Sequence, residues 1–111
     1  MSRICYVELP ASNLASTRTF YGDAFGFALT DYGPSYSCTT TGDVDIGLQG
    51  DPSEASSAPL PIIAVDDLEA CFAAVQEAGG TITKPVFAFP GGRRFHFRDP
   101  SGNELAAMKA D

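Results

Sequence analysis

The residues of this chain that could do chemistry are concentrated in the stretch RRFHFRDPSGNELAAM at 93–108. Arg94, His96 and Arg98 occupy alternate positions there, with phenylalanines between them. Successive side chains of a β-strand point to opposite faces. The stretch therefore predicts a strand with one aromatic face in the core and one cationic face that carries the single histidine of the chain.

A second candidate group lies in the first predicted strand, RICYVEL at 3–9. Glu8 is a carboxylate in a mostly apolar strand, so it must be paired or lie in a solvated cavity. A salt bridge with Arg94 or His96 would satisfy it structurally. Alternatively, Glu8 and His96 could form an acid–base pair for proton transfer beside a carbonyl, as in an isomerase or a lyase.

Composition limits the classes of partner. The formal net charge of −7 disfavours nucleic acid, and three of the seven basic residues fall at 93–98, which favours a small ligand. No apolar run approaches the ~20 residues of a membrane span. No signal peptide is evident. Cys5, Cys38 and Cys71 are odd in number and lack zinc spacing, so we expect reduced thiols in a cytoplasmic protein.

Apolar spacing and capping residues predict the same order of elements in both halves, strand–helix–strand–strand–strand. The first half has strands at 3–9 and 27–32, a helix that starts at Ser12 or Asn13 and ends at Gly26, and a hairpin at 36–49 that turns at Gly42-Asp43. The second half has strands at 60–65 and 81–86, a helix that starts at Asp66 or Asp67 and ends at Gly79-Gly80, and a hairpin at 93–108.

The two halves align with a shift of 54 residues, which places position 13 on 67 and position 26 on 80. We therefore expect one α+β domain over 1–111, built from two βαβββ modules that form a half-barrel around a central cavity. Module one covers 3–49, a polar linker covers 50–59, and module two covers 60–109. The sequence leaves open whether the modules pair within one chain or between chains.

The chain resembles the vicinal oxygen chelate superfamily, which includes glyoxalase I, bleomycin-resistance proteins, fosfomycin-resistance enzymes and extradiol dioxygenases. The resemblance rests on VELPASNL and TFYGDAFGF within 7–27, IAVDDLEACFAAVQEAGG at 63–80, and FRDPSGNEL at 97–105. It implies the paired βαβββ architecture that the internal repeat indicates independently.

The enzymes of this superfamily usually hold a divalent metal ion with four inward side chains. The resemblance places those positions at Tyr6, Gly47, Leu60 and Ala106, and Gly, Leu and Ala offer no side-chain ligand for an ion. We therefore expect no metal or other cofactor, and no reaction that uses an ion as Lewis acid. An unusual metal site built from Glu8 and the second module's His96 and Glu104 stays open as an alternative.

The resemblance and the strand alternation together predict which side chains face the cavity. Turning the hairpin at Gly42-Asp43 places Cys38 opposite Gly47 and Tyr36 opposite Gln49, so that both face inward. Arg94 and His96 fall at positions that face the ligand in relatives. The predicted ligand-binding residues are Tyr6, Glu8, Tyr36, Cys38, Arg94, His96, Glu104 and Met108.

The preferred function is that of a metal-free, homodimeric binding protein of the bleomycin-resistance type, which sequesters a small organic or antibiotic-like molecule. Whether it is an enzyme stays undecided, and the candidates for catalysis are Glu8 and His96. A metal-independent isomerase or lyase and a glyoxalase-like enzyme with a non-standard site are the alternatives. A third possibility, an interaction module without a closed cavity, predicts a large exposed apolar patch.

Overall fold

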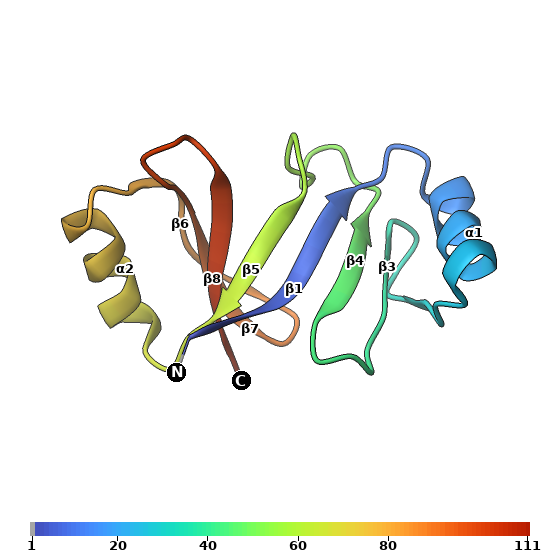
Figure 1. Ribbon diagram of the computed structural model, residues 1–111, viewed down its shortest axis with the longest axis horizontal. Helices are drawn as coiled ribbons and strands as arrows, with labels where there is room; N and C mark the ends of the chain where they lie inside the picture. Colours follow the sequence, from blue (N-terminus) through green and yellow to red (C-terminus); the bar gives the residue numbers. More distant parts are fainter. Residues whose placement is uncertain (1) are drawn as a thin grey trace. The chain divides into compact units, whose positions relative to one another are not determined.

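The computed structural model describes residues 2–111. The chain forms two compact units, residues 6–60 and residues 2–5 together with 61–111. In chain order the elements are β1 (Arg3–Pro10), α1 (Leu14–Phe25), β2 (Thr30–Asp31), β3 (Tyr36–Cys38), β4 (Asp45–Gln49), β5 (Leu60–Ala64), α2 (Leu68–Glu77), β6 (Thr81–Phe89), β7 (Gly92–Arg98) and β8 (Glu104–Ala110) (Figure 1). The α+β class and the repeated βαβββ order are confirmed.

Both modules use the same strand order. In the first, β1 pairs with β4 in parallel and β3 runs antiparallel between β4 and β2. In the second, β5 pairs with β8 in parallel and β7 runs antiparallel between β8 and β6. The structure therefore repeats the element order that the two halves of the sequence share.

Capping residues set the ends of both helices. Asn13 caps α1 and Asp67 caps α2, each by accepting a backbone N–H of the first turn through its side chain. Gly26 ends α1 with φ 71°, and Gly79 follows α2 with φ 99°. Glycine tolerates this left-handed conformation, so both helices end where the sequence predicts.

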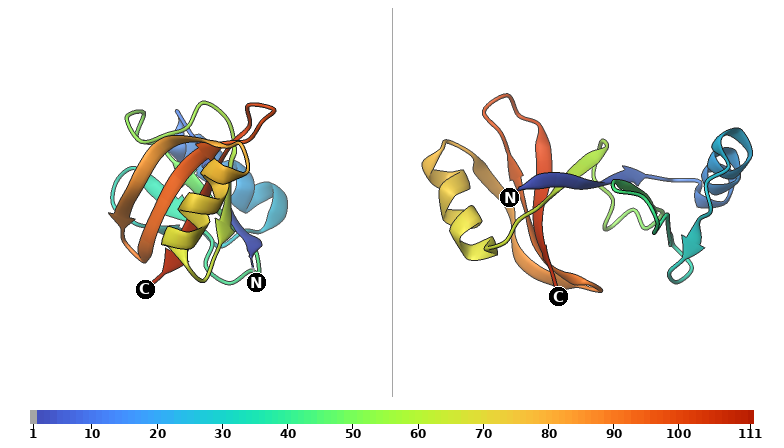
Figure 2. Two further views of the ribbon diagram at one scale, coloured as in Figure 1. Left: turned by 90° about the vertical axis from the view of Figure 1, so that its left-hand side faces the viewer. Right: turned by 60° about the horizontal axis from the view of Figure 1, so that its bottom comes forward.

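The α2 helix covers one face of its strands (Figure 2). Leu68, Phe95 and Ala107 form the buried centre, and Cys71 and Phe72 of the helix pack against it. The rings of Phe72 and Phe95 meet edge to face with their centroids 5.1 Å apart. This packing confirms that the aromatic face of β7 lies in the core.

The α1 helix lies beside β3 and contributes less to its core (Figure 1). None of the described residues Leu14–Phe25 is buried, and Phe20 and Phe25 are 56% and 62% exposed. Their rings contact each other and Tyr21 instead. The strand predicted over 27–32 is shorter than expected, since only Thr30–Asp31 pairs with β3.

The hairpin β3–β4 has the predicted register but a different turn. Cys38 lies opposite Gly47 and Tyr36 opposite Gln49, as expected. However, Gly42 is not among the residues of positive φ, which a two-residue hairpin turn would require. Asp45 holds a wider loop instead, because its Oδ1 accepts the Gly42 N–H at 2.9 Å. The register is nevertheless the predicted one, because the wider loop is still centred between Gly42 and Asp43.

Candidate functional site

The first unit brings three predicted side chains together on one face. The hydroxyl groups of Tyr6 in β1 and Tyr36 in β3 lie 2.6 Å apart. Tyr36 also donates a hydrogen bond of 3.0 Å to Oε1 of Glu8, which is only 4% exposed. Because Tyr36 has one hydroxyl hydrogen and gives it to Glu8, its oxygen accepts the hydrogen of Tyr6. A directed chain of hydrogen bonds therefore runs from Tyr6 through Tyr36 to Glu8.

Gly47 in β4 makes room for this chain. A Cβ atom at Gly47 would collide with the hydroxyl oxygens of both Tyr6 and Tyr36 and would lie 2.8 Å from Cε2 of Tyr6. Glycine is common where another group approaches the backbone of a strand this closely. The resemblance identified Gly47 only as a position where the metal ligand is absent. In the structure, its lack of a side chain leaves room for the hydroxyl groups of Tyr6 and Tyr36.

Burial keeps the phenols of this face protonated. It raises the pKa of Tyr6 and of Tyr36 well above the usual value, and the hydrogen bond from Tyr6 to Tyr36 raises the pKa of Tyr6 further. Cys38 is buried beside Tyr6, and burial raises the pKa of its thiol as well. This face therefore offers neutral hydroxyl and thiol groups around the Glu8 side chain.

The second unit carries His96 on the face of β7 opposite the core. The residue is 4% exposed and lies across from Ala106 of β8 and Lys84 of β6. Its Nδ1 faces Oε2 of Glu104 at 3.7 Å, and that oxygen also accepts the Thr83 hydroxyl at 2.8 Å. Among residues 2–111, Nε2 of His96 has no hydrogen-bond partner. The imidazole thus has a carboxylate near Nδ1 and a buried Nε2 without a hydrogen bond.

The surroundings of His96 favour its neutral form. Burial lowers its pKa to about 4, and the positive charge of Arg94 contributes to the decrease. Glu104 opposes this shift and Lys84 adds to it. At pH 7 the ring is therefore uncharged. Oε2 of Glu104 is the acceptor nearest to the ring, and its distance of 3.7 Å from Nδ1 is too long for a hydrogen bond.

Cations and aromatic rings surround this imidazole. The Lys84 Nζ lies 4.5 Å from the centroid of the Phe87 ring. The Arg94 guanidinium carbon lies 5.3 Å from the centroids of both Phe87 and Phe89. The rings of Phe87 and His96 are 5.6 Å apart. We call these five residues the cationic–aromatic face.

The sequence analysis missed three members of this face: alternation places Lys84 on the core side, and Phe87 and Phe89 lie beyond the strand predicted at 81–86. Strict alternation groups Lys84 with Ile82 and Val86, which pack against the core. The pairing of β6 with β7 shifts register twice between residues 82 and 87, which turns Lys84 to the side of His96. Pro85 was the available signal, because proline inside a strand marks an edge or a bulge.

The other residues singled out from the sequence have separate places. Arg98 donates a hydrogen bond of 3.0 Å to the Gly102 carbonyl in the β7–β8 turn. Met108 lies opposite Arg94 in the β7–β8 ladder and is half-buried. Arg93 forms an ion pair of 2.7 Å with Glu69 of α2, on the core side of the strand. Of the three arginines at 93–98, only Arg94 belongs to the cationic–aromatic face.

The positions that hold metal ions in relatives are occupied by structural residues here. Leu60 and Ala106 are fully buried, and Gly47 seats the two phenols. Within residues 2–111, no group of three or more His, Cys, Asp or Glu side chains is arranged to hold an ion. In the same part of the chain, no helix is long and apolar enough to cross a membrane.

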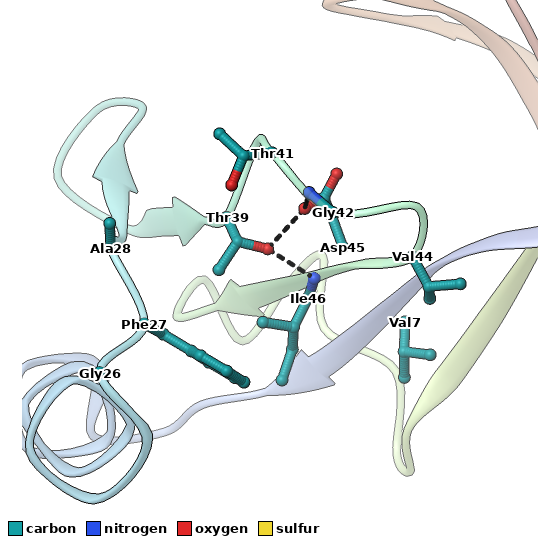
Figure 3. A pocket seen from close by; sticks show the side chains of 10 residues that line it. All are labelled: Val7, Gly26, Phe27, Ala28, Thr39, Thr41, Gly42, Val44, Asp45 and Ile46. Carbon is teal, nitrogen blue, oxygen red and sulfur yellow. Dashed lines mark hydrogen bonds between the residues drawn. The ribbon is translucent and has the colours of Figure 1, made fainter.

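An open hollow of about 600 Å³ lies on the other face of β1 and β4 (Figure 3). Val7 and Ile46, which are neighbours in register, form part of its floor, and Phe27 borders it. The polar groups at its edge already bond to each other, since Thr39 donates to Asp45 at 2.8 Å. The remaining lining residues are Gly26, Ala28, Thr41, Gly42 and Val44. This hollow is apolar and lies away from the predicted site residues.

Comparison with known proteins identifies the family and the fold. Residues 3–107 match the family described as Glyoxalase/Bleomycin resistance protein/Dioxygenase superfamily. No curated protein matches the sequence significantly. Among solved structures, a member of this superfamily from Vibrio splendidus 12B01 has a TM-score of 0.74 at 19% identity, with 100% of both chains covered.

Two further structures show how varied the proteins of this fold are. Methylmalonyl-CoA epimerase from Mycobacterium tuberculosis has a TM-score of 0.78 at 14% identity, covering 97% of this chain and 87% of that chain. The Mn(II)-bound glyoxalase from Novosphingobium aromaticivorans has a TM-score of 0.71 at 20% identity, covering 98% of this chain and 40% of that chain. Likeness at such low identity shows a common fold, and activity must be argued from side chains.

Proposed function

Since the chain belongs to the glyoxalase/bleomycin resistance protein/dioxygenase superfamily, we propose that it binds and sequesters a small organic molecule. Binding uses the His96 side of β7 in the second unit. The proposal places the protein with the bleomycin-resistance type of member rather than with the metalloenzymes.

The observation that carries this proposal is the state of His96. A buried polar nitrogen without a hydrogen bond costs about 1–3 kcal/mol of stability, and few are left in native proteins. Nε2 of His96 is such a nitrogen among residues 2–111. A ligand that forms a hydrogen bond with Nε2 would satisfy it.

The hydrogen-bonded side chains of Tyr6, Tyr36 and Glu8 in the first unit are a separate candidate for ligand contact. The hydroxyls of Tyr6 and Tyr36 already bond to each other and to Glu8, so their positions are fixed before a ligand arrives. Preorganised groups of this kind reduce the entropy lost on binding. Few polar groups among aromatic walls are typical of small-molecule sites.

The acid–base alternative has less support. A general acid needs a pKa near the working pH, and a histidine with a pKa of about 4 has no proton to give at pH 7. Oε1 of Glu8 also already accepts the hydroxyl of Tyr36. Should any turnover be detected, Glu8→Gln decides this alternative. Loss of turnover with fold and affinity intact would support proton transfer by Glu8, and unchanged turnover would exclude it.

The proposed function is tested by a screen that uses His96 variants. A library of hydroxylated aromatic acids, aromatic antibiotics and keto acids is screened by thermal shift, and hits are titrated by calorimetry. We expect at least one micromolar ligand whose affinity falls tenfold or more in His96→Leu. Arg93→Gln is the matched control, because Arg93 neighbours the site in sequence but lies on the core side of β7. Hits that bind His96→Leu as tightly as the wild type would contradict the proposal.

Elemental analysis of the purified protein tests the metalloenzyme alternative. A stoichiometric divalent ion would favour a metal site that includes His96 and Glu104 and would count against sequestration without a metal. The His96→Leu variant separates the two cases, because it would lose the ion if His96 were a ligand. Sub-stoichiometric traces that are equal in both proteins would support the proposed function.

A further inference from the structure

Large aromatic side chains stay exposed on the outer side of α1. Phe20 and Phe25 are more than half exposed, and none of the described residues Leu14–Phe25 is buried. The ring centroids of Phe20 and Phe25 lie 6.3 Å apart, and the centroid of Phe27 lies 5.7 Å from that of Phe25. We call these three side chains the aromatic patch. Continuous apolar surface of this kind marks an interaction site.

The internal repeat shows that the two sides of α1 have exchanged their usual composition. With the shift of 54 residues, Phe20 aligns with Ala74, which is exposed on α2. Arg18 aligns with Phe72, which packs against the core of the second unit. The α1 helix therefore has an aromatic residue where α2 meets solvent, and a cation where α2 meets its core. This exchange favours a partner on the outer side of α1.

The hollow shown in Figure 3 borders the aromatic patch, because Phe27 belongs to both. Val7 and Ile46 form part of its floor, and Val44, which also lines it, is 52% exposed. Small-molecule sites measure roughly 300–1,000 Å³, so a hollow of about 600 Å³ has room for a phenylalanine side chain. The first unit thus presents projecting rings beside a hollow that accepts a ring.

The charges around the aromatic patch do not oppose the approach of a second copy. The α1 helix has no net charge, since Arg18 and Asp23 are its charged residues. Arg18 also forms an ion pair of 2.8 Å with Asp31, and the carboxylate of Asp45 at the hollow accepts two hydrogen bonds. A chain with a net charge of −7 attracts a basic partner over its acidic surface and repels a second copy there. The aromatic patch is therefore suited to an uncharged contact between two copies.

We infer that this protein forms a homodimer through the aromatic patch, in which Phe25 of each copy lies in the hollow of the other copy. A stable interface buries roughly 800 Å² of each partner and has an apolar centre within a polar rim. With roughly 150–250 Å² for each fully exposed ring, the three rings present about 300 Å² to solvent. They supply the centre of the interface, and the walls of the hollow and the polar residues of α1 supply the rest.

The short distance between the rings and the hollow favours a closed dimer. In a two-fold dimer both copies use the same surface, so each contact forms twice. Phe25 lies next to Phe27 at the border of the hollow, with 5.7 Å between their ring centroids. Both contacts therefore fit about one two-fold axis. A ring distant from the hollow would instead produce open chains of copies.

Sedimentation velocity tests the dimer directly. Interfaces of this size have dissociation constants from micromolar downwards, so the protein is measured from about 1 to 200 µM. We expect a dimer in the wild type and at least tenfold weaker association in Phe20→Gln/Phe25→Gln. Val44→Gln, which makes the hollow polar, should weaken association as well. Tyr32→Gln is the matched control, because Tyr32 is 58% exposed and lies outside the aromatic patch.

Hydrogen exchange of the α1 amides gives a second readout that needs no variant. A helix of 12 residues is marginally stable alone in water, so packing against a second copy should slow its exchange. We expect the protection of Leu14–Phe25 to increase with protein concentration. The protection of Leu68–Glu77 should stay constant, because α2 already packs against the core of its own unit.

Three results would overturn the inferred dimer: a monomer at every concentration, a dimer that persists in Phe20→Gln/Phe25→Gln, or equal weakening in Tyr32→Gln. The outcome does not depend on ligand binding at His96, because the aromatic patch lies in the first unit and His96 in the second. A monomer that binds ligands through His96 would therefore contradict the dimer and leave the proposed function intact.

Discussion

The hydroxyl oxygens of Tyr6 and Tyr36 lie 2.6 Å apart, directly over the backbone of Gly47. Two strands that flank β4 thus direct their phenols to the one residue of β4 that has no side chain. The resemblance to the metal-binding members of the superfamily predicts a metal ligand at this position, which glycine cannot supply. In this chain the hydroxyl groups of Tyr6 from β1 and Tyr36 from β3 occupy this place. Tyr36 also donates a hydrogen bond to Glu8.

Gly47→Ala should disrupt this arrangement. The added Cβ would collide with both hydroxyls, so either the phenols move and lose their hydrogen bond or β4 shifts. Overpacking of this kind costs typically about 1–3 kcal/mol. We expect a loss of that size in the free energy of unfolding, measured by urea denaturation.

The control for this prediction is Gly22→Ala in α1. A Cβ at Gly22 would meet only the Phe27 carbonyl oxygen, at an ordinary 3.8 Å. Alanine inside a helix is more favourable than glycine by about 0.5–1 kcal/mol, so this variant should be slightly more stable than the wild type. Equal stability of Gly47→Ala and the wild type would show that the phenols do not depend on Gly47.

Tyr36→Phe should weaken the fold by removing the middle of the hydrogen-bond chain. Glu8 is 4% exposed and would lose the hydroxyl that bonds to its Oε1. Leaving a buried acceptor without its donor costs about 1–3 kcal/mol, and more for a charged group. Tyr32→Phe is the control, because Tyr32 is 58% exposed. Denaturation midpoints that fall equally in both variants would contradict a special role for Tyr36.

Much of the fold follows from local rules that the sequence obeys. The alternation in β7 predicted that Phe95 packs in the core and His96 on the opposite face, and the two residues are 0% and 4% exposed. Symmetry about Gly42-Asp43 predicted that Tyr36 lies opposite Gln49 and Cys38 opposite Gly47, which is the observed register. The two-residue period of side chains along a strand predicts which residues face the core. The centre of the hairpin turn predicts which residues pair, because it sets the register.

Three features could not be predicted in this way, because they depend on departures from regular geometry. The bulges in β6 move Lys84 to the side of His96, and their number is not evident from a single proline. The β3–β4 loop is wider than a two-residue turn because the side chain of Asp45 accepts a hydrogen bond from the backbone N–H of Gly42. The limited burial of α1 depends on how Phe20 and Phe25 pack, which helical spacing does not reveal.

His96→Leu should leave the protein as stable as the wild type or more stable. The substitution removes a buried nitrogen that lacks a hydrogen bond among residues 2–111 and adds apolar volume beside Phe87. The expected gain is between 0 and about 2 kcal/mol in the free energy of unfolding. Phe95→Ala on the core side is the contrast and should lose about 3–5 kcal/mol. A large loss in His96→Leu would indicate that His96 is a structural residue rather than a binding residue.

The pH dependence of stability should carry the signature of His96. Its pKa is lowered to about 4 in the folded chain, by burial first and then by Arg94 and Lys84 against the opposing effect of Glu104. Between pH 6.5 and 4 the unfolded state therefore binds more protons at this residue than the folded state does. Stability must rise with pH across this window and be lost as pH falls, by at most about 1.4 kcal/mol per pH unit from one group.

The difference between wild type and His96→Leu isolates this contribution, because carboxyl groups whose pKa values are lowered, such as Asp31 and Asp99, are common to both proteins. Urea denaturation at half-unit steps from pH 4 to 7 should give a steeper slope for the wild type. Titration of the His96 ring by NMR checks the same quantity directly. In Lys84→Gln the pKa of His96 should rise, since one of the two neighbouring positive charges is gone. A midpoint near 6.5 in the wild type would mean that the ring is charged at mildly acid pH and is not held neutral by burial.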